Sequence, residues 1–168
     1  LFEFGKAYTF HKKEGTDDPQ KQYKEENMLS LFITGSKNVT TWNAKEVKTD
    51  FFYLKAYCEM ILNRLGLQPD NLKIETSDKD IFREGLTYKM GDKHIVSMGI
   101  VSKAPLKRTD VNQEVYYAEF SWENILKAIK NQTVTFVPLS KFPSVKRDLA
   151  LLLDKKVTFK EIKETAFR

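Results

Sequence analysis

The sequence predicts an α+β protein in which an antiparallel sheet carries its helices on one face. Three observations lead to this class. Strand-like segments outnumber amphipathic helices, their order along the chain is hairpin, helix, several strands and helix, and one pair of strands is closed by a Gly91-Asp92 turn. The 168 residues suffice for one hydrophobic core, or for one domain and a fragment of a second.

The first two strands are predicted at residues 1–10 and 28–34, where aromatic and aliphatic residues recur. The polar segment between them, residues 11–26, contains Gly15 and Pro19 and is predicted to be an exposed loop. Further strands are expected at residues 72–75, 85–90, 94–101 and 115–120. A short helix is predicted to follow Ser121, because serine suits the position that caps a helix.

Residues 49–66 are predicted to form the long helix of the domain, beginning at Thr49 or Asp50 and ending at Gly66. One apolar row has the spacing of a packed helix face and consists of Leu54, Cys58, Ile61 and Leu65. A second row lies beside it and consists of Tyr53, Tyr57 and Met60. A helix that packs on a single surface needs only one apolar face, and these two rows together are wider than that. The second row therefore either adds to the core or contacts a partner protein.

The C-terminal segment is predicted to start a second domain. Residues 138–143 contain two prolines and suit a linker, and Leu149–Leu153 is an unbroken apolar run that predicts a buried strand. Thr158 and Glu161 have the spacing of a capping box, which predicts a helix start. One strand and one helix cannot form a stable domain. We therefore expect residues 138–168 to be truncated, and the strand at 149–153 to fold back on the core or to pair with a second copy of the chain.

Positive charge is concentrated in the same segment. The net charge of the chain is +5, and residues 139–168 hold eight Lys and Arg against four Asp and Glu. Such a bias indicates either a solvated surface or a face that contacts phosphates. The candidates for phosphate contacts are the lysines of this segment: Lys146, Lys155, Lys156, Lys160 and Lys163.

Residues typical of catalysis or metal binding are sparse. His11 and His94 are the only histidines and have no Cys or carboxylate at the spacing of metal ligands, so no metal site is predicted. The sequence contains no Gly-rich phosphate loop, and its first arginine is Arg64. Cys58 is the only cysteine, which excludes an internal disulfide and favours a cytoplasmic location.

Several stretches resemble a known family. Residues 141–153, KFPSVKRDLALLL, are similar to the beginning of the ferredoxin-like anticodon-binding domain of the phenylalanyl-tRNA synthetase β subunit. Residues 1–8, 29–35, 50–55 and 115–120 resemble the synthetase-like core domain of that subunit. The resemblance implies a class II aminoacyl-tRNA synthetase-like antiparallel sheet flanked by helices in residues 1–137. It also implies an incomplete ferredoxin-like β-α unit, the start of the anticodon-binding domain, in residues 138–168.

The same resemblance implies a core without catalytic residues. In class II folds the first hairpin carries an arginine that binds the α-phosphate of ATP, and a later strand and helix carry another. Residues 1–35 contain no arginine, and residues 95–101 contain none either. Lys6 has the charge but not the forked, bidentate geometry of a guanidinium group. We therefore expect no catalytic residue, and no cofactor bound by this part of the chain.

The resemblance further implies an assembly. In the family, an α subunit supplies the active site, and α and β subunits form a heterotetramer that joins phenylalanine to tRNA(Phe) with ATP and Mg²⁺. Tyr53, Tyr57 and Met60 would then contact the α subunit, and the C-terminal lysines would contact tRNA.

Two other functions remain open. A free-standing RNA-binding or adapter module would need a complete basic domain, because a single strand and helix do not make one. A self-contained amino-acid-activating ligase would show phenylalanine-dependent pyrophosphate exchange by this chain alone.

Overall fold

The computed structural model describes residues 1–11, 19–38, 41–133, 135–136 and 138–167, and for Pro19, Lys21 and Lys160 only the backbone. The chain divides into two compact units, Leu1–Thr133 and Val134–Arg168. Each unit is described by itself. No helix in the described residues is both long enough and apolar enough to cross a membrane.

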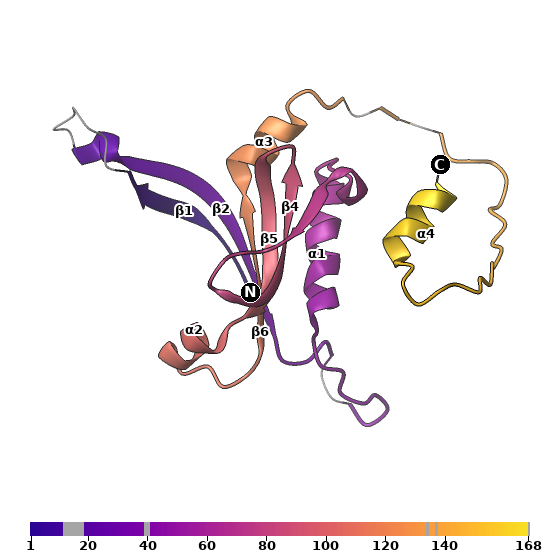
Figure 1. Cartoon of the computed structure of the whole chain (residues 1–168), viewed down its shortest axis with the longest axis horizontal. Helices are drawn as coiled ribbons and strands as arrows, with labels where there is room; N and C mark the ends of the chain where they lie inside the picture. Colours follow the sequence, from indigo (N-terminus) through magenta and orange to yellow (C-terminus); the bar gives the residue numbers. More distant parts are fainter. Residues whose placement is uncertain (12–18, 39–40, 134, 137, 168) are drawn as a thin grey trace. The chain divides into compact units, whose positions relative to one another are not determined.

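The first unit is built on a six-stranded antiparallel sheet with the spatial order β1-β2-β6-β5-β4-β3 (Figure 1). Every neighbouring pair in this order is antiparallel. The strands are β1 (Phe2–Phe10), β2 (Tyr23–Thr34), β3 (Lys73–Thr76), β4 (Phe82–Met90), β5 (Lys93–Val101) and β6 (Val115–Ser121). The prediction of an α+β fold with an antiparallel sheet is confirmed.

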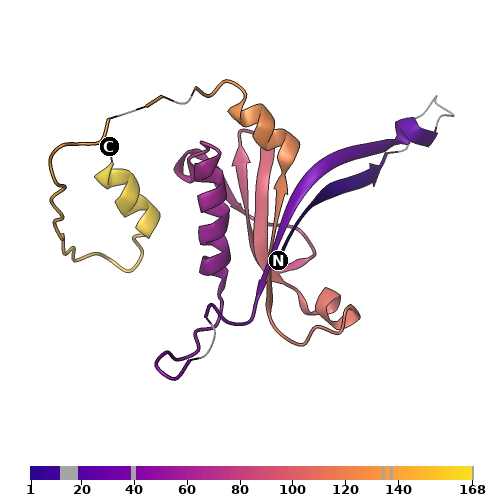
Figure 2. The same cartoon turned by 180° about the vertical axis from the view of Figure 1, so that it is seen from behind.

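Strands β1 and β2 extend beyond the rest of the sheet as a two-stranded arm (Figures 1 and 2). Their pairing runs without interruption from Phe2 opposite Leu31 to Phe10 opposite Tyr23. The predicted loop at residues 11–26 is therefore wrong at its C-terminal end, since β2 begins at Tyr23. Pairing with β1 supplies the backbone hydrogen bonds of this segment even though its side chains are polar. Residues 12–18 of the predicted loop lie outside the described residues.

The helix α1 (Phe51–Arg64) confirms the predicted long helix. Asp50 caps it, since its Oδ1 accepts a hydrogen bond of 2.7 Å from the backbone N–H of Tyr53. Gly66 follows with φ of +83°, the left-handed conformation that favours glycine. Leu54, Cys58 and Leu62 of α1 are fully buried and form the core with residues of the three central strands: Tyr88, Val96, Met98, Ala118 and Phe120.

The helix α3 (Trp122–Ile129) packs on the same core beside α1, with Ile125 fully buried. Ser121 stands at its N-cap position, but its side chain makes no capping hydrogen bond. A further short helix, α2 (Lys103–Arg108), follows β5 and has no counterpart among the predicted elements. Both packed helices thus cover one face of the sheet and leave the other free of them.

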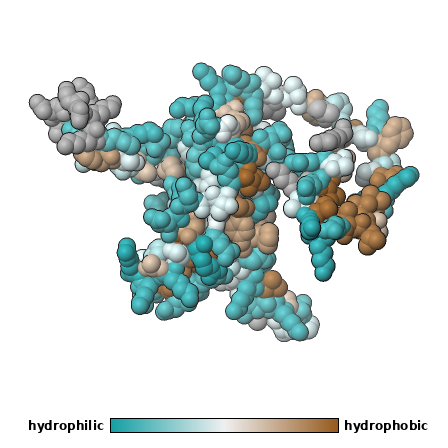
Figure 3. All heavy atoms as spheres, in the orientation of Figure 1, coloured by the Kyte–Doolittle hydropathy of each residue, from teal (hydrophilic) through white to brown (hydrophobic). Residues whose placement is uncertain are grey.

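The second unit contains the helix α4 (Phe159–Ala166), which begins with the predicted capping box. The backbone N–H of Thr158 donates to Glu161 Oε2 at 2.7 Å. The predicted strand at Leu149–Leu153 is wrong for this chain, because these residues have no regular secondary structure and Leu152 is fully exposed. A strand needs a neighbour for its backbone groups, and no other strand occurs in the described part of this unit. The space-filling view accordingly shows hydrophobic atoms exposed on and around α4 (Figure 3).

Candidate functional site

The face of the sheet that α1 and α3 leave uncovered, here called the second face, is filled by aromatic side chains. Phe32 of β2 and Tyr117 of β6 lie with their ring centroids 4.7 Å apart, and Phe82 lies 6.1 Å from Tyr117. The Phe82 ring packs onto the backbone at Gly99, where an added Cβ would lie 2.6 Å from Phe82 Cδ1. A ligand could reach β5 at this point only by displacing the Phe82 ring.

The polar side chains beside these rings are already paired with one another. Lys79 Nζ donates to Glu119 Oε2 at 2.9 Å, the hydroxyls of Thr87 and Ser97 are 2.9 Å apart, and His94 Nε2 lies 2.7 Å from Ser97 Oγ. Burial, together with the positive charge of Lys79, lowers the pKa of His94, so its imidazole is neutral at pH 7. In the described part of the chain, no three His, Cys, Asp or Glu side chains gather into a metal-binding group. The described side chains of the second face therefore pack on or pair with one another, and they stabilise the fold.

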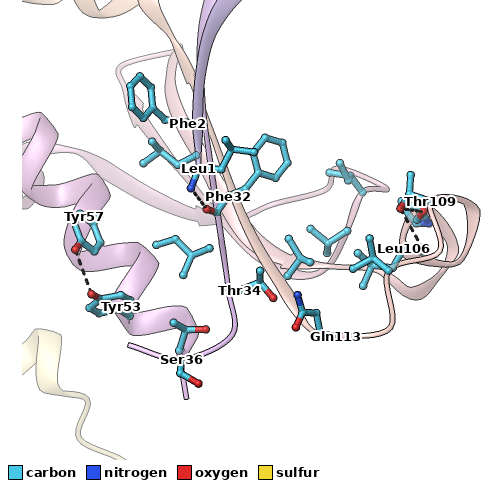
Figure 4. A pocket seen from close by; sticks show the side chains of 18 of the residues that line it. Leu1, Phe2, Phe32, Thr34, Ser36, Tyr53, Tyr57, Leu106, Thr109 and Gln113 are labelled. Atoms are coloured by element: carbon cyan, nitrogen blue, oxygen red, sulfur yellow. Dashed lines mark hydrogen bonds between the residues drawn. The ribbon is translucent and has the colours of Figure 1, made fainter. Parts of the chain in front are cut away.

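An apolar groove of about 790 Å³ lies at the C-terminal end of β2 and is called the β2-end groove here. In Figure 4, α1 with Tyr53 and Tyr57 lies on one side of β2, and the segment with Leu106 and Thr109 lies on the other. The lining on the α1 side includes Leu31, Ile33, Tyr53, Tyr57 and Ile61. The remaining lining includes Phe32, Ile81, Val101, Pro105, Leu106, Val111 and Val115.

Strand β2 contributes to both sides of the groove because side chains alternate along a strand. Leu31 and Ile33 pack against the core beneath α1, whereas Phe32 contacts Tyr117 on the second face. Lys37 is the one Lys, Arg, Asp or Glu among the described lining residues, and its Nζ lies 2.7 Å from Asp50 Oδ2. The groove thus offers a largely apolar surface whose one lysine is paired with Asp50, which suits an apolar polypeptide better than a phosphate.

The structure brings two of the three predicted interface residues into this groove. The hydroxyls of Tyr53 and Tyr57 are 3.2 Å apart and their rings meet edge to face. Met60 lies about one turn further along α1, outside the lining, with 55% of its surface exposed. Contact of these three residues with a partner stays a prediction. Sequence patterns could not add Leu106 or Val101 to the site, because only the tertiary fold brings them next to β2.

The predicted phosphate contacts all belong to the second unit. Lys146, Lys155 and Lys156 are exposed, and Lys163 lies on α4. Lys155 and Lys156 form the turn that precedes Thr158, and the backbone N–H of Lys156 donates to Asp154 Oδ1 at 2.9 Å. The side chain of Lys160 lies outside the described part of the structure. Their contact with tRNA likewise stays a prediction.

Comparison with known proteins identifies the family. Residues 1–122 match the family model described as "Phenylalanyl tRNA synthetase beta chain CLM domain". The chain belongs to the phenylalanyl-tRNA synthetase β-chain family. The predicted family is therefore confirmed, and the alternative of a free-standing RNA-binding or adapter module is not favoured.

Relatives of this β-chain family member are phenylalanine–tRNA ligase beta subunits. The chain is 42% identical to that of Bacteroides thetaiotaomicron over 99% of its own length and 21% of the relative's. It is 37% identical to that of Porphyromonas gingivalis, over 99% of its own length and 20% of the relative's. The chain thus spans about one fifth of the length of the relatives it matches.

A solved structure of a pyrrolysyl-tRNA synthetase from Desulfitobacterium hafniense has a similar fold. Its TM-score is 0.52 at 16% sequence identity, and the match covers 77% of this chain and 41% of that one. A second structure of a pyrrolysyl-tRNA synthetase from the same organism gives a TM-score of 0.51 at 15% identity, covering 77% and 40% of the two chains. The β-chain family member therefore shares an aminoacyl-tRNA synthetase-like fold.

Proposed function

We propose that this chain is a non-catalytic, structural and tRNA-binding part of the β subunit of phenylalanine–tRNA ligase, with a class II core in residues 1–137. Family membership supports the assignment, and the packed second face supports the absence of chemistry. Adenylate formation requires preorganised cationic groups around the phosphates. The second face offers instead the ring of Phe82 closed over Gly99 and a Lys79–Glu119 ion pair.

The holoenzyme would supply what this chain lacks. The α subunit would carry the active site and bind ATP and Mg²⁺. Two kinds of subunit would form a cytoplasmic heterotetramer that attaches phenylalanine to tRNA(Phe). The β2-end groove and the neighbouring surface of α1, with Tyr53, Tyr57 and Met60, would be the contact with the α subunit.

The second unit would contribute to tRNA binding once complete. Residues 138–168 would form the start of the ferredoxin-like anticodon-binding domain, and Leu149–Leu153 would pair with strands that follow in the full subunit. In the isolated chain the same exposed segment would pair with a second copy. The candidates for tRNA contacts remain the lysines of this unit: Lys146, Lys155, Lys156, Lys160 and Lys163.

The test is reconstitution of the full β subunit with the α subunit. Tyr57→Glu places a charge on the groove and should abolish both α–β association in sedimentation and aminoacylation. Leu126→Glu on α3 is the matched control, because Leu126 is 50% exposed, lies on another helix of the same unit and is not among the lining residues of the groove. Equal association of both variants would contradict the proposed interface. Phenylalanine-dependent pyrophosphate exchange by this chain without α would contradict the non-catalytic role.

A further inference from the structure

A second hollow, here called the α2 pocket, lies beside α2 at the end of the sheet where β5 ends and β6 begins (Figures 1 and 2). It has a volume of about 430 Å³. The apolar part of its lining also lines the β2-end groove and consists of Val101, Leu106 and Val111 (Figure 4). The rest is polar and exposed to solvent, and consists of Arg83, Lys103, Lys107, Asn112, Gln113 and Glu114.

The polar lining of the α2 pocket is cationic. Arg83, Lys103 and Lys107 contribute three positive charges against the single carboxylate of Glu114, which leaves a net charge of +2 at pH 7. Neither Lys103 nor Lys107 forms an ion pair with any residue that the structure describes. In the β2-end groove, by contrast, the one lysine is paired with Asp50. The two ammonium groups of the α2 pocket are therefore available to an anion.

Glu114 holds the guanidinium of Arg83 in place at this pocket. Arg83 Nη2 donates to Glu114 Oε1 at 3.0 Å, and the hydroxyl of Tyr116 donates to Glu114 Oε2. The bonds from Tyr116 and Arg83 lower the pKa of Glu114, so its carboxylate is ionised at pH 7. Both carboxylate oxygens thus accept a hydrogen bond within the chain, while a guanidinium has five N–H donors and this ion pair uses one of them. Arg83 is positioned and still has donors for a ligand.

We infer that the α2 pocket binds a backbone phosphate of tRNA; this inference rests on the proposed function. Guanidinium and ammonium groups are the main donors to nucleic-acid phosphates, and the amides of Asn112 and Gln113 can donate to phosphate or sugar oxygens. Contacts of this kind position an RNA without reading its bases. The first unit would then contribute a tRNA contact of its own, in addition to the lysines proposed in the second unit.

The exposure of the pocket favours a polynucleotide over a small anion. All six polar lining residues are exposed, so a ligand can continue past the pocket on the surface. A site for free phosphate or another small molecule would bury most of its ligand. The uncharged amides of Asn112 and Gln113 beside the cations suit the sugar that adjoins each phosphate, whereas an acidic protein segment would need cations alone.

The first experiment removes the two unpaired cations and leaves the Arg83–Glu114 pair intact. Lys103→Ala with Lys107→Ala is made in the full β subunit, which is assembled with α. The matched control, Lys93→Ala with Lys130→Ala, removes the same charge from exposed lysines at the start of β5 and the end of α3, outside the pocket. Affinity for tRNA(Phe) is measured by filter binding between about 50 and 200 mM salt.

The pocket variant should bind tRNA(Phe) about tenfold more weakly and reduce the slope of log affinity against log salt by about 1–2, while the control changes neither. Equal effects of the two variants would overturn the inference. So would loss of α–β association in sedimentation by the pocket variant, since the pocket would then hold an acidic segment of the α subunit. An unchanged affinity and slope refute this inference alone, whereas a wild-type holoenzyme that does not bind tRNA(Phe) refutes the proposed function as well.

The second experiment needs no variant and covers the case in which the pocket variant fails to fold. Acetylation of lysines by an amine-reactive reagent is followed by mass spectrometry in the holoenzyme alone, with tRNA(Phe), and with inorganic phosphate at the same ionic strength. The inference expects tRNA(Phe) to slow the modification of Lys103 and Lys107 several-fold and to leave Lys93 unchanged. Equal rates with and without tRNA(Phe) would exclude the contact, and equal protection by inorganic phosphate would indicate a small-anion site; either result overturns the inference.

Discussion

Gly99→Ala tests whether the second face is as tightly packed as the contacts of Phe82 indicate. The added Cβ would lie 2.5 Å from the carbonyl O of Glu84 and 2.6 Å from Phe82 Cδ1. The first contact is with backbone of the paired strand β4, so it cannot be relieved by a rotamer change. Overpacking of this kind costs about 1–3 kcal/mol. With a urea m-value of about 2 kcal/mol/M, a loss of about 2 kcal/mol lowers the unfolding midpoint by about 1 M.

Gly5→Ala is the matched control because it makes the same substitution in strand β1, where the nearest heavy atom to the added Cβ is 3.9 Å away. It should leave the free energy of unfolding unchanged or raise it by up to about 1 kcal/mol. Both variants are compared by urea unfolding followed by circular dichroism. In a Phe82→Ala background, Gly99→Ala should cost less, since the ring contact is gone while the contact with Glu84 remains. If Gly99→Ala unfolds at the same urea concentration as Gly5→Ala, the second face has room for a ligand and the packing argument for an inactive core fails.

Three further predictions concern other parts of the chain. Burial raises the pKa of the Cys58 thiol to about 12 from 9.0, so the free energy of unfolding should fall as pH rises from 9 toward 12. Cys58→Ala should make the slope of unfolding free energy against pH less steep by about 1.4 kcal/mol per pH unit in this range. An unchanged slope would contradict the burial of the thiol. Thr158→Ala removes the Oγ1 that accepts from Glu161 N, and should lower the helicity of α4 in NMR chemical shifts, since it removes about 1 kcal/mol from a short helix. Lys155→Ala with Lys156→Ala in the full β subunit should reduce the slope of log tRNA affinity against log salt by about 1–2; an unchanged slope would remove both lysines from the tRNA contact.

The local elements of this protein follow closely from sequence patterns. The spacing of apolar residues predicts α1, the Gly91-Asp92 turn predicts the β4–β5 hairpin, and Thr158 with Glu161 predicts the start of α4. Each of these signals depends on residues within one or two turns or on two adjacent strands. The family resemblance also lies in short blocks of sequence, which is why it could be recognised before the fold was known.

The errors arise where a segment depends on partners far away in the chain. Tyr23–Glu26 looks like loop by composition, yet β1 offers it a continuous set of backbone hydrogen bonds. Leu149–Leu153 looks like a buried strand, yet the described part of its unit contains no second strand with which it could pair. Strand formation is a property of a pair of segments, so the sequence of one segment cannot decide it.

The sequence by itself determined the family, the antiparallel α+β class, the long helix and the absence of arginine from the first hairpin. Only the tertiary structure decided that Phe82 closes over Gly99, and that Leu31, Tyr57 and Leu106 line one groove. The physical reason is that propensity, capping and periodicity act over a few neighbouring residues. The packing of Phe82 on Gly99 and the lining of the β2-end groove instead depend on strands and helices that are distant in the sequence. The groove, for example, is lined by residues from Leu1 to Val115.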